Sequence, residues 1–273
     1  MVQEDYILQF EKLLKKSFRK LHRPGLKKAG LLFSGGVDSS LTAKLAKDCN
    51  FSPRDASHGT SPTLLSLRTE KAKDVEHIKK AANFLDLPLV FVDVDEKYIK
   101  KELPKLKKIL KEFKIEQNLM QFSLGLSMYF LAKRAKSLKL KACFCGQGSD
   151  ELFTGYHKYK KVEGNKVQGN KLKELIRQEY ERLKRVDEVR DMGIFKKFGL
   201  ELFSPFLDKK VVKFSLGLPT DLLRNKKENK IIVRRLAQKL GLPAFIYKKP
   251  KKALQYSTGI QKLVRKALDQ EKW

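Results

Sequence analysis

Short apolar runs alternate with longer amphipathic stretches over the first 150 residues of the chain. Short apolar runs bounded by turn residues are typical of buried strands, whereas apolar residues spaced three and four apart are typical of helices. The predicted strands are 29–33, 64–68, 89–93 and 141–145. The predicted helices are 5–20, 38–47, 71–85, 96–112 and 119–138. Because strands and helices alternate, we expect an α/β fold with a mostly parallel sheet covered on both faces.

The pattern changes after about residue 155. The polar stretch 158–173, which carries glycines and asparagines, predicts a flexible loop or lid, and the Ser-, Pro- and Gly-rich stretch 50–63 predicts another loop. Further helices are predicted at 171–184, 208–217, 228–240 and 257–268. We therefore expect a single domain over 1–273, with an α/β core at about 1–157 and a mostly helical lobe at about 158–273.

Charge changes the picture of possible partners. The chain has 60 Lys and Arg against 31 Asp and Glu, a formal net charge of +29. Such an excess attracts polyanions, so the partner is RNA, or only ATP and other metabolic anions. A Lys-rich solvated surface explains the composition equally well, because the basic residues are spread along the chain rather than gathered in a tail.

Targeting and metal-site signals are absent from the sequence. No apolar run is long enough to span a bilayer, and the acidic start Met1–Asp5 has no signal-peptide pattern, so we expect an intracellular, cytoplasmic protein with no membrane partner. Cys49, Cys143 and Cys145 have neither disulfide-framework nor zinc spacing. The four histidines are scattered, and we assign no metal-binding histidine.

The first motif with clear chemistry lies between a predicted strand and a predicted helix and reads Ser34-Gly35-Gly36-Val37-Asp38-Ser39-Ser40. Its glycines let backbone N–H groups approach phosphate oxygens, its serines can donate hydroxyl hydrogen bonds, and the helix N-terminus favours an anion. An aspartate here would repel phosphate unless a cation stood between them, so Asp38 implies Mg²⁺ bridging to pyrophosphate. The alternative is an ordinary Ser/Gly turn that caps a helix.

This loop lacks the lysine of the common nucleoside triphosphatase loop and is not a dinucleotide-binding glycine pattern. It resembles the pyrophosphate loop of the N-type ATP pyrophosphatases, which have an adenine nucleotide alpha hydrolase-like fold. That superfamily includes asparagine, argininosuccinate, NAD and GMP synthetases and tRNA-modifying enzymes. The resemblance implies cleavage of ATP to AMP and pyrophosphate through an adenylated substrate.

A second motif follows the fourth predicted strand and reads Cys145-Gly146-Gln147-Gly148-Ser149-Asp150-Glu151-Leu152-Phe153-Thr154-Gly155-Tyr156. Its glycines allow close approach to a nucleotide, and its two acids lie at a helix start. Because neighbouring parallel strands end at the same edge of a sheet, Asp150 can bind the same Mg²⁺ as Asp38. The alternative is a glycine turn with a helix-capping acid.

The second motif resembles the second signature of the synthetase domain of asparagine synthetases, Ser-Gly-Glu-Gly-Ser-Asp-Glu-Leu-Phe-Gly-Gly-Tyr. Two further blocks are similar to that family, and all four occur in the family order over roughly 28–262. The further blocks are Glu201 with 205–208 and 218–219, and Lys230 and Arg234 with 242–243 and 250–256. The chain therefore resembles the short archaeal members, which lack a glutaminase domain.

The resemblance implies that ATP adenylates the side-chain carboxylate of aspartate and that ammonia then gives asparagine. Carried over by position, Phe33 and Leu67 flank adenine, and Cys145 and Gly146 border the nucleotide. Asp38 and Asp150 hold Mg²⁺–pyrophosphate, and Lys251 stabilises charge on the α-phosphate, although it also belongs to the basic run 248–252. The implied catalytic residues are Lys251, Gln147 and Asp38, and the implied substrate-binding residues are Gly148, Ser149, Asp150 and Glu151.

Three positions depart from the family pattern. Gln147 stands where the family has a glutamate, and Gly193 and Phe203 stand where it has basic residues. Arg190, Lys196 or Lys197 is a candidate to supply the missing charge. Two alternatives to asparagine synthesis therefore stay open: adenylation of tRNA or another carboxylate, and a degenerate nucleotide-binding relative. We expect free ammonia, or ammonia from a separate glutaminase subunit, as the nitrogen source.

Overall fold

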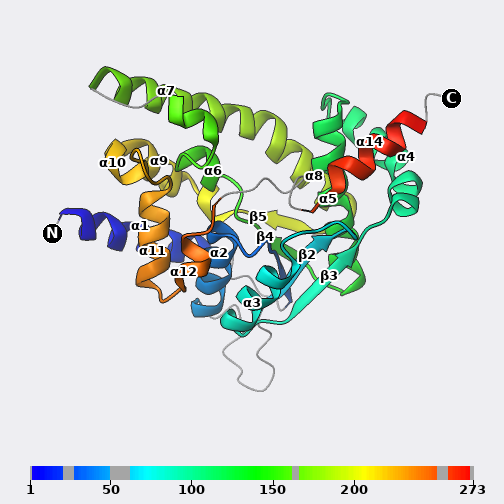
Figure 1. Cartoon of the computed structure of the whole chain (residues 1–273), viewed down its shortest axis with the longest axis horizontal. Helices are drawn as coiled ribbons and strands as arrows, with labels where there is room; N and C mark the ends of the chain where they lie inside the picture. Colours follow the sequence, from blue (N-terminus) through cyan, green and yellow to red (C-terminus); the bar gives the residue numbers. More distant parts are fainter. Residues whose placement is uncertain (1, 21–27, 50–61, 162–165, 251–257, 271–273) are drawn as a thin grey trace.

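The computed structural model of the protein describes residues 2–20, 28–49, 62–161, 166–250 and 258–270. Its centre is a five-stranded sheet in the order β3-β2-β1-β4-β5, and every pair of neighbouring strands is parallel (Figure 1). The strands are β1 (Ala29–Leu32), β2 (Thr63–Arg68), β3 (Leu89–Asp93), β4 (Ala142–Phe144) and β5 (Glu201–Phe203). The predicted α/β class with a parallel sheet is confirmed.

Successive strand residues point to two separate apolar layers. Leu31, Leu64 and Phe144 belong to one buried cluster, whereas Leu32 and Leu65 belong to the other. Because both faces of the sheet are buried, its strands are continuous apolar runs rather than alternating ones. This is why four strands could be predicted from short apolar runs.

Helices cover both faces of the sheet (Figure 1). The first apolar layer contains buried residues of α1 (Val2–Lys20), α2 (Val37–Asp48), α3 (Val75–Leu85) and α11 (Ile231–Lys239). The second layer contains buried residues of α4 (Glu96–Glu112), α5 (Leu119–Ser137), α8 (Glu188–Lys197) and α14 (Ile260–Gln270). The other α-helices among the described residues are α6 (Ser149–Leu152), α7 (Lys166–Arg182), α9 (Lys209–Gly217), α10 (Thr220–Leu223) and α12 (Ala244–Tyr247).

Three short helical segments link these elements. They are the 3-10 helices His157–Lys161 and Pro205–Leu207 and the π-helical turn Leu183–Asp187, which joins α7 to α8. The π-helical turn matters for the site because single π turns inside helices are frequent at functional positions. Asp187 is the last residue of this turn and directly precedes α8.

The predicted loop at 158–173 is wrong for its second half, because α7 begins at Lys166. Leu172 and Ile176 are 3% and 0% exposed and belong to the first apolar layer. This four-residue spacing buries one face of a helix, and that burial outweighs the weak helix propensity of the nearby glycine and asparagine. Residues 162–165, and residues 50–61 of the other predicted loop, lie outside the described residues.

The second half of the chain contributes to the sheet as well as to the helical part. The three-residue strand β5 pairs in parallel with β4 and was not predicted. Buried residues of α14 pack with α4 and α5 in the second apolar layer. Elements from both sides of residue 157 thus pack in the same apolar layers. The division of the chain at about residue 157 stays an expectation. Among the described residues, no helix combines the length and the apolar content needed to cross a membrane.

Candidate functional site

The two sequence motifs meet where the strand order reverses. The Ser34–Ser40 loop follows β1 and the 145–156 motif follows β4, and these two strands are neighbours that lead to opposite ends of the sheet. In open parallel sheets, the crevice outside the carboxyl ends of the strands at such a switch point is the usual ligand site. The hydroxyl of Ser149 donates a hydrogen bond to Oδ1 of Asp38 at 2.7 Å and so ties the two motifs together.

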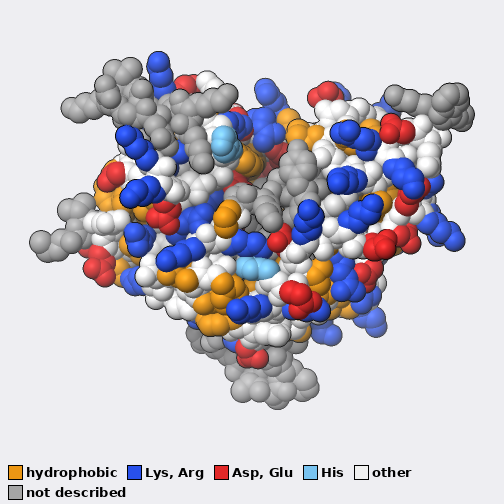
Figure 2. All heavy atoms as spheres, in the orientation of Figure 1, with side chains coloured by type: hydrophobic (Ala, Val, Ile, Leu, Met, Phe, Trp, Pro, Cys, Tyr) orange, Lys and Arg blue, Asp and Glu red, His pale blue; other side chains and the backbone are white. Residues whose placement is uncertain are grey.

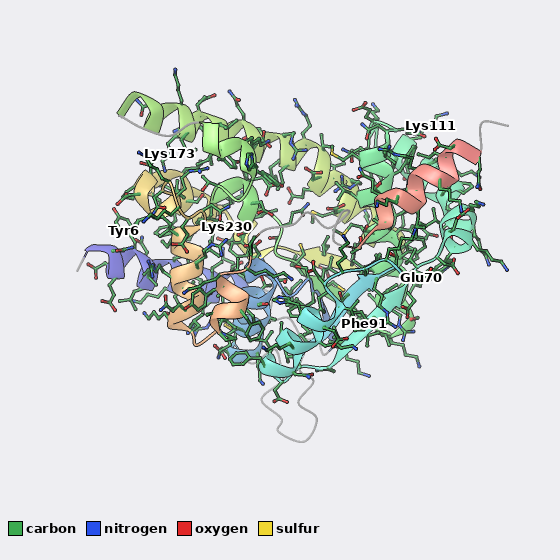
Figure 3. The ribbon with its side chains drawn as sticks, viewed as in Figure 1. Tyr6, Glu70, Phe91, Lys111, Lys173 and Lys230 are labelled. Carbon is green, nitrogen blue, oxygen red and sulfur yellow. The ribbon has the colours of Figure 1, made fainter. Side chains whose placement is uncertain are left out.

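A buried lysine joins the two aspartates that the sequence singled out. Lys230 Nζ lies 2.6 Å from Asp38 Oδ2 and 2.6 Å from Asp150 Oδ1, and its side chain is 1% exposed. Figure 3 shows Lys230 beside the start of α11, near the middle of the molecule. A Cβ on Gly155 would lie 1.9 Å from Asp150 Oδ1 and 2.3 Å from Lys230 Cε. Glycine at 155 is therefore required for the two charged groups to meet.

The aspartates fit a magnesium ion that is shared with phosphate. Both Asp38 and Asp150 line the main cavity of the site. No group of three or more His, Cys, Asp and Glu suited to a metal occurs among the described residues. Magnesium is usually bound by one or two carboxylates together with substrate phosphates and water, and a carboxylate offers several lone pairs. Asp38 and Asp150 are thus the residues that would hold Mg²⁺–pyrophosphate, and Lys230 Nζ lies 2.6 Å from an oxygen of each.

Hydrogen bonds within the Ser34–Ser40 loop fix its conformation. Ser39 Oγ accepts from the Ser34 N–H at 3.2 Å and donates to the Gly36 carbonyl at 3.2 Å. Gly35 has φ of +67°, a conformation that favours glycine, and its carbonyl is 2.8 Å from a ring nitrogen of His77. Ser34, Asp38 and Ser39 line the cavity, whereas the predicted ligand Ser40 is fully buried within α2.

The cavity has a volume of about 680 Å³, and much of its lining is apolar. The apolar lining includes Phe33 and Leu67, the two predicted adenine neighbours, and residues of α5. The α5 side chains are Met120, Leu124, Met128 and Leu131. Apolar walls with a few convergent polar groups are typical of nucleotide and cofactor pockets. The α5 residues were missed because apolar residues at helical spacing are the ordinary sign of a core-facing helix.

The same cavity is also lined by a buried network of charged side chains. Arg190 is 2% exposed; its Nε donates to Asp191 Oδ1 at 2.7 Å and its Nη1 donates to Asp187 Oδ1 at 2.9 Å and Gln121 Oε1 at 2.6 Å. Gln147 Nε2 donates to Asp191 Oδ2 at 2.9 Å. Burial raises the pKa of Asp191, and the adjacent Arg190 guanidinium opposes that rise. No sequence motif marked Asp187, the last residue of the π-helical turn, or Asp191 on α8.

Glu151 is another buried acid at the cavity. It is 4% exposed, and its Oε1 accepts from the Tyr156 hydroxyl at 2.5 Å. Burial, reinforced by the neighbouring Asp150 carboxylate, raises the pKa of Glu151 to about 7. The Tyr159 hydroxyl donates to the Glu151 carbonyl at 2.8 Å and fixes the backbone of the short helix α6. Glu151 can therefore bind or release a proton near neutral pH.

The three departures from the family pattern have different surroundings. Gly193 is buried in α8, where a Cβ would lie 2.6 Å from the Phe113 ring, so no larger residue fits without movement. Phe203 lies on β5 with its ring 6.3 Å from that of Phe144. Of the cations considered as replacements, Arg190 lines the cavity, whereas Lys197 is exposed and pairs with Glu112 at 2.6 Å.

The remaining predicted site residues divide into three groups. Cys145, Gly146 and Gly148 line the cavity, and burial raises the pKa of the Cys145 thiol to about 12, so this cysteine stays protonated. Ser149 is fully buried and acts on Asp38 rather than facing the cavity. Lys251 lies outside the described residues, and its role stays a prediction.

Comparison with known proteins gives a consistent family. The model of the asparagine synthase family matches residues 9–197 and 194–272. A protein of Methanocaldococcus jannaschii that is provisionally named a glutamine-hydrolyzing asparagine synthetase is 30% identical over 287 aligned positions, covering 94% of this chain and 50% of that protein. An asparagine synthetase domain-containing protein of Saccharomyces cerevisiae is 26% identical and covers 86% of this chain and 48% of its own length. The chain thus spans half or less of these relatives.

Solved structures are also similar to the chain, and one of them is from an archaeon. It is described as a predicted subunit of a tRNA methyltransferase from Methanocaldococcus jannaschii, and it matches with a TM-score of 0.35 and 14% identity over 81% of this chain and 93% of that chain. A likeness at this level supports no inference about the fold or the function of this chain.

Proposed function

The chain belongs to the asparagine synthase family, and from this premise we propose that it is an ATP-dependent amide ligase that adenylates a carboxylate and then aminates it. The proposed substrate is the side-chain carboxylate of aspartate, and the proposed products are asparagine, AMP and pyrophosphate. The proposed nitrogen source is ammonia, either free or delivered by a separate glutaminase subunit.

One observation carries the proposal: the two motifs line a single cavity with Asp38 and Asp150, and the buried Lys230 joins these two aspartates. Two carboxylates that flank a buried ammonium would bind Mg²⁺ and pyrophosphate. They lie beside a loop whose backbone N–H groups can bind phosphate oxygens. Apolar residues that would contact adenine line the same cavity. A purely structural Ser/Gly turn would not require this convergence.

Different residues of the cavity have different proposed roles in adenylation. The apolar lining with Phe33, Leu67 and α5 would take adenine, and the loop with Ser34 and Ser39 would take the phosphates. Lys251 is the proposed cation at the α-phosphate, where charge develops as pyrophosphate leaves. Bound Mg²⁺ would neutralise the departing pyrophosphate. Holding the substrates in one orientation lowers the entropic barrier between carboxylate and ATP.

A second candidate function is adenylation of an RNA substrate. The net charge of +29 favours it, and Figure 2 shows Lys and Arg side chains spread over the visible face of the molecule. A spread of this kind attracts polyanions without defining one docking surface. Asparagine synthesis remains the better supported reading because its sequence blocks all occur in order.

The test is pyrophosphate release from Mg-ATP with aspartate, ammonium, both, or bulk tRNA added. Release that requires aspartate, with asparagine formed when ammonium is present, supports the synthetase proposal. Release stimulated only by tRNA transfers the protein to the RNA-modifying alternative. Asp38→Asn should abolish any release observed. Bound ATP without release under every condition would favour the degenerate nucleotide-binding relative and contradict the proposal.

A further inference from the structure

Five basic residues form one face of the N-terminal helix α1. They occupy the i, i+3, i+4, i+7 and i+8 positions that share one side of a helix, and they are Lys12, Lys15, Lys16, Arg19 and Lys20. These five line a surface groove of about 570 Å³, the basic groove, and no other described residue contributes to its lining. Four of them are exposed, and Lys15 is partly buried. As far as the chain is described, the basic groove therefore offers positive charge and no apolar side chain.

The opposite face of α1 fixes these cations in place. Phe10, Leu14 and Phe18 are 0% exposed and belong to the first apolar layer. The Phe10 ring lies 5.0 Å from that of Phe153, and the Phe18 ring lies 5.2 Å from that of Phe144. The helix cannot rotate without opening the core, so its basic face stays on the outside. Cations held on a rigid helix lose less entropy on binding a ligand than cations on a mobile segment.

Only part of this charge is compensated within the described structure. Lys15 Nζ donates to Glu11 Oε1 at 2.6 Å, and Lys20 pairs with Asp208. The other three cations form no ion pair with a described residue, and they are Lys12, Lys16 and Arg19. Like charges one helical turn apart destabilise a helix, so this face lowers the stability of α1 until an anion binds to it.

The chemistry of the basic groove selects a polyanion. Interfaces between folded proteins have apolar or aromatic anchors at their centre, and the described lining has none. A helix that lies on a membrane inserts its apolar face, whereas the apolar face of α1 is buried in the core. A nucleic-acid backbone, in contrast, is bound by cations at its phosphates. The stretch from Lys12 to Lys20 is about 12 Å long at about 1.5 Å per residue, so about three phosphates of one strand can lie along it.

We propose that the basic groove binds the phosphate backbone of a single-stranded nucleic acid. A volume of this size suits a few nucleotides of one strand. Contacts with phosphates carry no sequence information, so oligouridine and oligothymidine of equal length should bind equally well. The basic groove shares no lining residue with the cavity that contains Asp38 and Asp150. The inference therefore goes beyond the ligase function and does not depend on it.

Two charge-matched triple variants test the site. Fluorescence anisotropy with an oligouridine of about 20 nucleotides, over a range of salt concentrations, gives the affinity and its salt dependence. K12A/K16A/R19A should weaken binding about tenfold or more, and the slope of log K against log salt should become shallower by about 2, because three phosphate contacts of about 0.7 each are lost. The control K97A/K101A/K108A removes the same charge from three exposed lysines on one face of α4 and should change the affinity less than about threefold. Equal effects of the two variants would show that binding follows total charge, and would overturn the inference.

A single variant separates binding from folding. In Lys16→Glu the new carboxylate can pair with Lys12 and Lys20, one turn away on either side, so the melting temperature should be equal to or above that of wild type. The affinity for oligouridine should nevertheless fall about tenfold. Lys16→Arg keeps the charge and should bind as wild type does. An unchanged affinity in Lys16→Glu overturns the inference.

Other ligands test the class of partner. Poly-glutamate that binds more tightly than oligouridine, with the same loss in Lys16→Glu, would assign the basic groove to an acidic protein segment and overturn the nucleic-acid proposal. An oligouridine of about three nucleotides that binds as tightly as the long one would make the groove a site for small phosphates, with the same consequence. Pyrophosphate release with aspartate and ammonium should be equal in wild type and Lys16→Glu, so the nucleic-acid proposal and the ligase proposal succeed or fail separately.

Discussion

Lys230 Nζ lies 2.6 Å from Asp38 Oδ2, although 192 residues separate them in the chain. Lys230 precedes α11 in the left-handed conformation, with φ of +55°, which is uncommon for a residue with a side chain. Such backbone strain persists where the surrounding structure enforces it, and it clusters at functional sites. The contact with Asp38, and the equal one with Asp150, supplies that enforcement at the carboxyl end of the sheet.

Replacing Lys230 with methionine should destabilise the protein strongly. Removing one partner of a buried ion pair leaves a buried charge uncompensated and typically costs about 3–5 kcal/mol. Mg²⁺ can substitute for the lost ammonium between Asp38 and Asp150, so it should raise the melting temperature of Lys230→Met more than that of wild type. Melting curves with Mg²⁺ or with a chelator provide the measurement. Lys226→Met, at an exposed lysine nearby, is the control, and equal Mg²⁺ effects in all three proteins would argue against a metal at these aspartates.

Alanine at position 155 should separate Asp150 from Lys230. The added Cβ would lie 1.9 Å from Asp150 Oδ1, which is far inside van der Waals contact. We expect a loss of about 2–4 kcal/mol of stability, because overpacking and a disturbed buried ion pair act together. Chemical denaturation of Gly155→Ala measures it. Gly217→Ala is the matched control, since a Cβ there meets nothing within 4 Å, and comparable losses in both variants would contradict the packing argument.

Glu151 should make stability fall as the pH rises through neutrality. Its pKa is raised from 4.5 to about 7 in the folded protein, so folding favours the protonated acid. That stabilisation is present in full below pH about 4.5 and is lost as the pH rises through about 7. Glu151→Gln stays neutral, and its advantage over wild type should grow from near zero at pH 4.5 to at most about 3 kcal/mol at pH 8.

Urea denaturation at pH 4.5, 6, 7 and 8 measures the difference between Glu151→Gln and wild type. Glu116→Gln, at an exposed glutamate, controls for general charge effects in so basic a protein. A constant difference across this pH range would show that Glu151 is ionised in the folded protein, and the proposed proton exchange near neutral pH would then be wrong.

Most strands of the sheet were predictable because the pattern that marks a buried strand lies within its own residues. A strand buried on both faces is a short apolar run, and four such runs marked β1 to β4 correctly. The strand β5 escaped because three residues, with Glu201 exposed and Leu202 buried, are too few to show a pattern. The start of α7 was not predicted, because the glycines and asparagines of 158–173 favour turns. The burial of Leu172 and Ile176, which favours a helix, could be known only from the tertiary structure.

The site was predictable only where residues follow strand ends. Asp38 and Asp150 each come after a strand, and adjacent parallel strands place such residues near one another. Lys230 directly precedes α11 and Asp191 lies on α8, and packing sets the position of both helices on the sheet, so no spacing in the sequence brings these residues to the site. Lys230 lies in a block similar to the family but had no predicted role, and the hydrogen bond between Gln147 and Asp191 was not expected.

The apolar lining of the cavity gives the last prediction, which concerns ATP itself. Leu124 lies on α5 and lines the cavity together with Phe33 and Leu67, where the proposal places adenine. A glutamate there would introduce a partly buried negative charge beside a ligand that is itself anionic, so Leu124→Glu should weaken ATP binding at least tenfold, which corresponds to about 1.4 kcal/mol. Leu8→Glu, at a leucine that is 39% exposed on α1, makes the same change away from the cavity and should bind ATP as wild type does. Titration calorimetry with Mg-ATP compares the three proteins. Equal affinity for all of them would place the base elsewhere than against α5, and the proposed contact of adenine with these apolar residues would have to be abandoned.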